Sequence, residues 1–167
     1  YETIPLSIIV TENLIITVCM QDTPVLHPFM EGTIRGFNTF MRSRFILQIL
    51  YRNATMYLRY LRIIDRESDK LELKLRHSMQ NREIVMLMEL SKTLVYFTTS
   101  LKSNEIVMEK LTTLQRIKQY PDDEDLLDDV ITENKQAIEM ANIYSGVLAN
   151  MTDAFASVSY THLTLPT

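Results

Sequence analysis

Carboxylates near the C-terminal end are the residues of this sequence most able to do chemistry. Six acids occupy the eight positions 122–129, and Asp153 stands apart further along the chain. Carboxylates in the first turn of a helix face its partial positive end, which stabilises the helix by roughly 0.3–1 kcal/mol each. We expect residues 122–125 and Asp128 to act in this way, as a capping cluster on a solvated helix. Carboxylates beyond the first turn are free to attract a positively charged partner.

The charges of the chain are distributed unevenly. The formal net charge is −4, yet ten Lys and Arg residues face four acids between Arg35 and Arg76, and nine acids face Lys135 alone between Asp122 and Asp153. Two such segments attract each other, or each attracts a partner of opposite sign. Basic and acidic residues alternate from Asp65 onward, which argues against nucleic acid as that partner.

The segment from Asp123 to Val158 has helical periodicity and contains no proline. At a rise of 1.5 Å per residue, such a helix would be roughly 50 Å long. Two of its stripes are mostly apolar and together are wider than a two-stranded seam requires. A third stripe, which we call the polar edge, is polar except for Ile143 and comprises positions 129, 132, 136, 139, 143, 146, 150 and 153. This pattern is typical of a bundle wall, whose polar edge could face a wet central axis in a symmetric oligomer. On a straight helix the two ends of this edge drift apart by about a third of a turn, so their alignment requires supercoiling.

Upstream segments predict the elements that must position this helix. Two short runs rich in β-branched residues, 6–10 and 14–20, are separated by the polar triplet Thr-Glu-Asn and indicate a β-hairpin. Helical spacing then runs from about Thr33 to Arg76 and from Glu83 to about Ile117. Only three glycines occur in the chain, and no proline lies between Phe29 and Tyr120, which favours few, long helices. We therefore expect an α+β fragment, mostly α, with a hairpin followed by three long helices.

The sequence gives little support for zinc binding, disulfide formation or enzymatic catalysis. His27, His77 and His162 lie in separate segments without Cys or His at ligand spacing, so we expect no zinc site. Cys19, the single cysteine, excludes an internal disulfide and is expected to be a core residue. We find no nucleophile elbow, glycine-rich phosphate loop or metalloprotease helix, and we expect no enzymatic activity. No run approaches the roughly 20 consecutive apolar residues that span a bilayer.

Three segments resemble one family in the same order along the chain. The sequence "YSGVLANMTDAFAS" (144–157) resembles the stretch before the first membrane helix of CorA magnesium transporters. The sequence "LVYFTTSLKSNEIVMEKL" (94–111) resembles the preceding cytoplasmic helix of that family, and "IPLSIIVTENLIITVC" (4–19) the last hairpin of its cytoplasmic sheet. The resemblance covers most of residues 4 to 157.

This resemblance implies a homopentameric transporter of the inner membrane with a large cytoplasmic funnel. The transported and regulatory ion would be Mg²⁺, although Co²⁺ and other divalent cations are carried by related proteins. The third helix would be the stalk that continues into the membrane and lines the pore. This chain would be the cytoplasmic part, with a role in ion sensing and gating.

The resemblance also carries two roles over to single residues. Asp129, followed by Val130, matches an aspartate that binds regulatory Mg²⁺ between subunits. Asp153 matches an aspartate at the cytoplasmic mouth of the pore. Both lie on the polar edge. Mg²⁺ prefers oxygen ligands and keeps several of its waters, so one or two carboxylates per subunit, contacting the ion through water, would form a weak site suited to millimolar concentrations.

The chain also departs from the family pattern. The Gly-Met-Asn signature and both membrane helices are missing, so we expect a fragment that is a monomer or a weak oligomer by itself. We divide it into the hairpin end of an α/β domain (1–30), two long antiparallel helices (31–120), the stalk (121–158) and a tail that we expect to be non-native (159–167).

Two other functions remain open from the residues. The apolar stripes of the third helix would also suit a helical oligomerisation scaffold with no role in transport. The basic first helix would also suit a binding module for an acidic partner.

Overall fold

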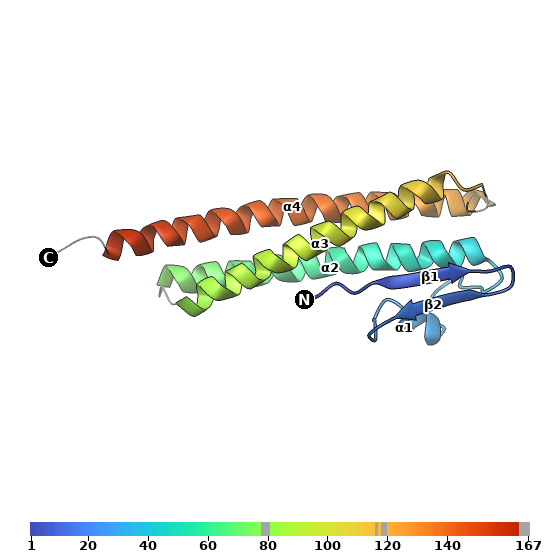
Figure 1. Cartoon of the computed structure of the whole chain (residues 1–167), viewed down its shortest axis with the longest axis horizontal. Helices are drawn as coiled ribbons and strands as arrows, with labels where there is room; N and C mark the ends of the chain where they lie inside the picture. Colours follow the sequence, from blue (N-terminus) through green and yellow to red (C-terminus); the bar gives the residue numbers. More distant parts are fainter. Residues whose placement is uncertain (78–80, 116, 118–119, 164–167) are drawn as a thin grey trace.

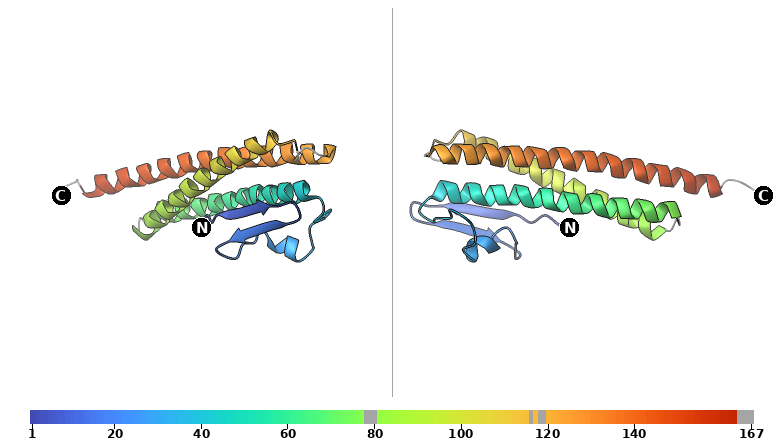
Figure 2. Two further views of the ribbon diagram at one scale, coloured as in Figure 1. Left: turned by 45° about the vertical axis from the view of Figure 1, so that its right-hand side comes forward. Right: turned by 180° about the vertical axis from the view of Figure 1, so that it is seen from behind.

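Three long helices form an elongated bundle that carries a small β-hairpin near one end (Figure 1). The computed structural model describes residues 1–77, 81–115, 117 and 120–163, and of residues 158–163 it describes the backbone alone. The long helices are α2 (Arg42–His77), α3 (Asn81–Thr112) and α4 (Pro121–Leu163). Seen from several sides, the C-terminal part of α4 extends beyond the C-terminal end of α2 and the start of α3 (Figure 2). The predicted hairpin followed by three long helices is confirmed.

The hairpin consists of two antiparallel strands, β1 (Leu6–Val10) and β2 (Ile15–Cys19), with Ile9 paired to Ile16. Its turn is closed at Thr11, whose backbone N–H donates to the carbonyl of Leu14 at 2.9 Å. The guanidinium of Arg42 donates to the carbonyls of Thr11 and Glu12, which ties the hairpin turn to the first residue of α2.

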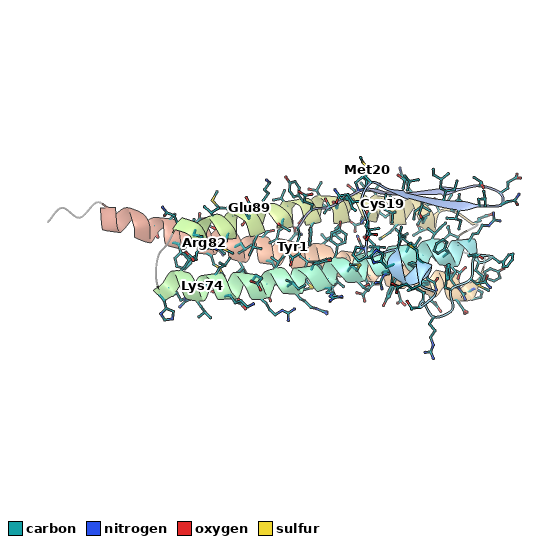
Figure 3. All side chains as sticks on the ribbon, turned by 90° about the horizontal axis from the view of Figure 1, so that it is seen from below. Tyr1, Cys19, Met20, Lys74, Arg82 and Glu89 are labelled. Carbon is teal, nitrogen blue, oxygen red and sulfur yellow. The ribbon has the colours of Figure 1, made fainter. Side chains whose placement is uncertain are left out.

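The two faces of the hairpin differ in their surroundings. One face carries Leu6 and Ile8, which pack on a small cluster formed by Val25, Phe29 and Ile49. The opposite face exposes apolar side chains, namely Ile9, Ile16 and Val18. Cys19, at the end of β2, is half-buried, and Figure 3 shows it beside Met20.

The connection between the hairpin and α2 differs from the prediction. A short helix, α1 (His27–Met30), is followed by turns, and α2 begins at Arg42 rather than near Thr33. The backbone of Gly36 has a φ of +69°, a left-handed conformation that interrupts a helix. Phe37 leaves the helical path and packs its ring 5.0 Å from that of Phe45, whereas Phe40 is 92% exposed. The helical spacing of Phe37 and Phe40 therefore does not reflect a helix, because both residues lie in the turns before α2.

The helix α3 ends earlier than predicted. It stops at Thr112, and tight turns follow in which the N–H of Ile117 donates to the carbonyl of Leu114 at 3.0 Å. Among the described helices, α3 alone is long and apolar enough to cross a membrane, with a mean hydropathy of 1.2 over its best window. Core helices of globular proteins share this composition, and here α3 packs against α2 and α4.

The main core lies between the three helices. Its fully buried members are mostly leucines and alanines, and they come from all three: Leu61, Ile64 and Leu75 of α2, Leu87, Leu94 and Leu101 of α3, and Ala137, Ala141 and Leu148 of α4. α4 has extensive contacts with both of the other helices. Burial on two sides holds α4 in one rotational setting and decides which of its edges stays in water.

Candidate divalent-cation site

The helix α4 is unbroken over its 43 residues, which corresponds to about 65 Å. Pro121 occupies its first turn, where a missing N–H costs no hydrogen bond, and three acids follow in the same turn. The prediction of a single long helix is confirmed, although the helix starts at Pro121 and continues to Leu163. Residues 164–167 of the predicted non-native tail lie outside the described residues.

The polar edge of α4 faces solvent along its whole length. Every one of its eight positions, from Asp129 to Asp153, is exposed, and Ile143, its one large apolar member, is 62% exposed. The opposite side of the helix carries the buried residues Leu127, Val130, Ala137, Ala141 and Leu148. Asp129 and Asp153 are therefore held away from the core of their own chain, where an ion or a second copy of the chain can reach them.

The two candidate ligands do not come together in one site. They are 24 residues apart on one straight element, which places them about 36 Å from each other. Among the described residues, no three His, Cys, Asp or Glu side chains are close enough to share a metal ion. Each aspartate can offer one carboxylate per chain, which fits an ion that keeps much of its hydration shell and is shared between chains.

An ion pair that the sequence analysis missed joins the start of α4 to the start of α2. The Nε of Arg44 donates to Oδ1 of Asp123 at 2.7 Å, and its Nη2 lies 3.5 Å from Oδ2 of Asp122. Asp123 is completely buried, so the prediction that it belongs to a solvated capping cluster is wrong. The hydrogen bond and charge of Asp123 raise the pKa of the Arg44 guanidinium. The expected attraction between the basic and acidic segments thus occurs within the chain at this point.

A second polar contact joins the middles of α2 and α4. Burial raises the pKa of the Asp65 carboxyl, the charge of Asp69 raises it further, and a hydrogen-bonding contact with Tyr144 opposes both effects. Burial and the nearby charge of Asp65 likewise raise the pKa of the Tyr144 phenol. Tyr144 lies on the side of α4 that faces α2 and off the polar edge, so this pair is not part of the candidate cation site.

The remaining candidates for metal binding are dispersed. Nε2 of His27, at the start of α1, lies 2.7 Å from Oδ1 of Asp22 in the preceding loop, which gives that imidazole a carboxylate partner. His77 is exposed as the last residue of α2, and the side chain of His162 lies outside the described residues. Cys19 donates its S–H to the carbonyl of Pro5 at 3.5 Å.

Comparison with solved structures identifies the fold. The soluble domain of CorA from Methanocaldococcus jannaschii superposes with a TM-score of 0.77 at 28% identity, over 89% of this chain and 61% of that one. The complete CorA magnesium transporter of the same organism has the same fold, with a TM-score of 0.75 at 21% identity, over 96% of this chain and 56% of that one. The chain therefore spans about three fifths of the length of the structures that it matches. No curated protein matches the chain.

The sequence itself also matches a family of transporters. The sequence model of the CorA-like Mg²⁺ transporter proteins matches residues 1–163, which is nearly the whole chain. The order of the elements, the long α4 and the structural likeness agree with that match. The chain belongs to the CorA-like Mg²⁺ transporter family.

Proposed function

We propose that this chain is the cytoplasmic, ion-sensing part of a divalent cation transporter, and that α4 is the stalk through which ion binding controls gating. The observation that carries the proposal is the polar edge of α4, which stays exposed from Asp129 to Asp153 while the opposite side of the helix is packed against α2 and α3. A helix whose polar face had no function would not need to be this long or to keep its polar residues on one exposed edge.

The proposed assembly is a homopentamer in which five copies of α4 surround a wet central axis. Asp129 would hold a regulatory ion between neighbouring copies, and Asp153 would lie at the cytoplasmic mouth of the pore. Since each copy offers single carboxylates, the ion would be bound through its waters. The ion would be Mg²⁺, with Co²⁺ and other divalent cations as further candidates, and the assembly would sit on the cytoplasmic side of the inner membrane.

The regulatory logic follows from charge. Carboxylates on neighbouring stalks repel one another, and bound cations neutralise that repulsion and favour the closed bundle. When the ions leave, the repulsion favours a splayed, conducting bundle. The ion then shifts an equilibrium only because it binds the closed bundle more tightly than the open one.

The exposed apolar face of the hairpin also supports a place within a larger domain. Side chains such as Ile9, Ile16 and Val18 are each between 43% and 51% exposed, and contiguous apolar surface of this kind is usually covered by a partner. We therefore assign residues 1–30 to the edge of a larger α/β domain, residues 31–120 to its flanking helices, and residues 121–158 to the stalk.

The proposal is tested in the full-length protein embedded in membranes, by protease digestion across a titration of Mg²⁺. The sensing account predicts protection at millimolar Mg²⁺ that Asp129→Asn weakens. The matched control is Asp128→Asn, an exposed neighbour on the same helix but off the polar edge, which should leave the titration unchanged. Sodium chloride of equal ionic strength separates specific binding from screening. Absence of any Mg²⁺ effect would favour an oligomerisation scaffold instead.

A further inference from the structure

Asn134 is an unusual residue in the buried face of α4. Among the described residues, only four polar or charged side chains are buried, namely Ser68, Thr93, Asp123 and Asn134. The hydroxyls of Ser68 and Thr93 donate to carbonyls of their own helices, and Asp123 pairs with Arg44. Asn134 alone reaches the backbone of another long helix, because its Nδ2 donates to the carbonyl of Leu101 in α3 at 3.1 Å.

The side-chain amide of Asn134 has a hydrogen-bond partner for its nitrogen but none for its oxygen. Asn134 is 0% exposed, and its Oδ1 is buried without a hydrogen-bond partner. A buried oxygen without a partner destabilises the fold relative to an apolar side chain of similar volume. A leucine at this position would therefore be expected to stabilise the bundle, so stability does not account for an asparagine here.

The neighbours of Asn134 explain what it can contribute. One and two turns further along the same buried face lie Ala137 and Ala141, both 0% exposed. Small side chains interlock weakly with a facing helix, so this stretch of the contact adds little to the packing that fixes the rotation and register of α4. A polar group with one acceptor specifies register, because a slip of one residue moves it by about 1.5 Å and rotates it by roughly 100°.

The position of Asn134 relates this register to the candidate cation site. It lies five positions after Asp129, which places the two side chains roughly 140° apart around the helix. While the amide points at Leu101, the polar edge must point away from α3. α3 packs against α4, and the two helices cross at an angle in Figure 1.

From these observations we infer that Asn134 is a positioning residue, which sets the rotation and register of α4 on α3 and so aims Asp129 and the rest of the polar edge outward. Its importance for ion sensing rests on the proposed function, but its effect on the helix does not. The hydrogen bond fixes the two helices against each other where the neighbouring side chains of α4, Ala137 and Ala141, are small.

The inference is tested by measuring distances between spin labels in the 167-residue chain, in a Cys19→Ser background. One label sits at Gln136 on α4, and a second sits at Lys102 on α3 or at Arg59 on α2, all three being exposed positions. Pulsed electron–electron double resonance then measures the distances between the labels, which report the rotation of α4 against both other helices. The unaltered chain should give one narrow distance distribution for each pair.

The variant Asn134→Leu should broaden or shift both distributions while the melting temperature stays the same or rises. The matched control is Thr93→Val, which also replaces a buried polar side chain by an apolar one but removes no bond between helices. It should leave the distributions unchanged. Unchanged distributions in Asn134→Leu would overturn the inference.

A second variant guards against overpacking by leucine. Asn134→Ala cannot overpack the contact between α3 and α4 and should broaden the same distributions. If both variants fail to fold, as judged by circular dichroism, the asparagine serves stability and the inference is wrong. Since no metal ion is involved, this result is independent of the Mg²⁺ titration of Asp129→Asn, and either account can fail without the other.

Discussion

Arg44 and Asp123, which lie 79 residues apart in the sequence, form an ion pair that fastens the first turn of α2 to the first turn of α4. Nε of the arginine is 2.7 Å from Oδ1 of the aspartate, whose side chain is 0% exposed, whereas the arginine side chain is 22% exposed. This geometry anchors the start of α4 to the rest of the chain and leads to the first prediction.

Arg44→Met should destabilise the fold by about 3 kcal/mol, because it leaves a buried carboxylate without its partner. The double variant Arg44→Met with Asp123→Asn should recover part of that loss, since the unpaired charge is then gone. Urea denaturation measures both. Asp122→Asn is the matched control, because Asp122 is 82% exposed and an exposed pair contributes about 1 kcal/mol or less. Equal losses for Arg44→Met and Asp122→Asn would contradict the anchoring role.

Asp65→Asn should change how stability depends on pH. The folded pKa of Asp65 is raised by burial and by Asp69, whereas the unfolded chain has a pKa near 3.9. Between these two values the folded state binds more protons, so this group makes stability fall as the pH rises. The variant lacks this contribution.

Thermal unfolding of the variant and the unaltered chain between pH 3.5 and 7 therefore tests this sign. Relative to the unaltered chain, Asp65→Asn should gain stability as the pH rises above about 4 and then level off. The groups that act on Asp65 are Asp69 and Tyr144, and Tyr144 is in turn influenced by the charge of Arg62. A stability difference that is constant across the range would contradict the raised pKa.

Paired alanine substitutions test the rotational setting of α4. Leu148 is 1% exposed, and Ile143, five residues earlier on the polar edge, is 62% exposed. Leu148→Ala should lower the free energy of unfolding by about 2–5 kcal/mol, the usual range for a buried leucine. Ile143→Ala should change it by no more than about 0.5 kcal/mol. Chemical denaturation compares the two, and a larger loss for Ile143→Ala would mean that the polar edge is buried.

Local periodicity predicted most of the architecture because amphipathic helices and β-branched hairpins are encoded by near neighbours. The exposed polar edge of α4, including Asp129 and Asp153, follows from spacings of three and four residues. The start of α2 did not follow, because Phe37 and Phe40 have helical spacing but lie in a turn shaped by Gly36.

Contacts between segments that are distant in the sequence could not be predicted, because the spacing of residues along the chain does not reveal them. Asp123 looks like any other first-turn acid, and only the approach of Arg44 makes it a buried anchor. Asn134 is a polar residue within one of the two mostly apolar stripes of this helix. Its partner, the carbonyl of Leu101, belongs to the backbone of another helix, and no side-chain pattern points to it.

The most direct test of the central claim is to ask whether ions pass along the polar edge of α4. In full-length protein lacking Cys19 and reconstituted into vesicles, Asn150→Cys on that edge is treated with a cationic thiol reagent while Mg²⁺ influx is recorded with a dye. Ser103→Cys, an exposed position on α3, is the control. We predict that the added positive charge lowers influx at position 150 and leaves it unchanged at position 103. Undiminished influx after complete labelling at position 150, or equal inhibition at both positions, would contradict the account.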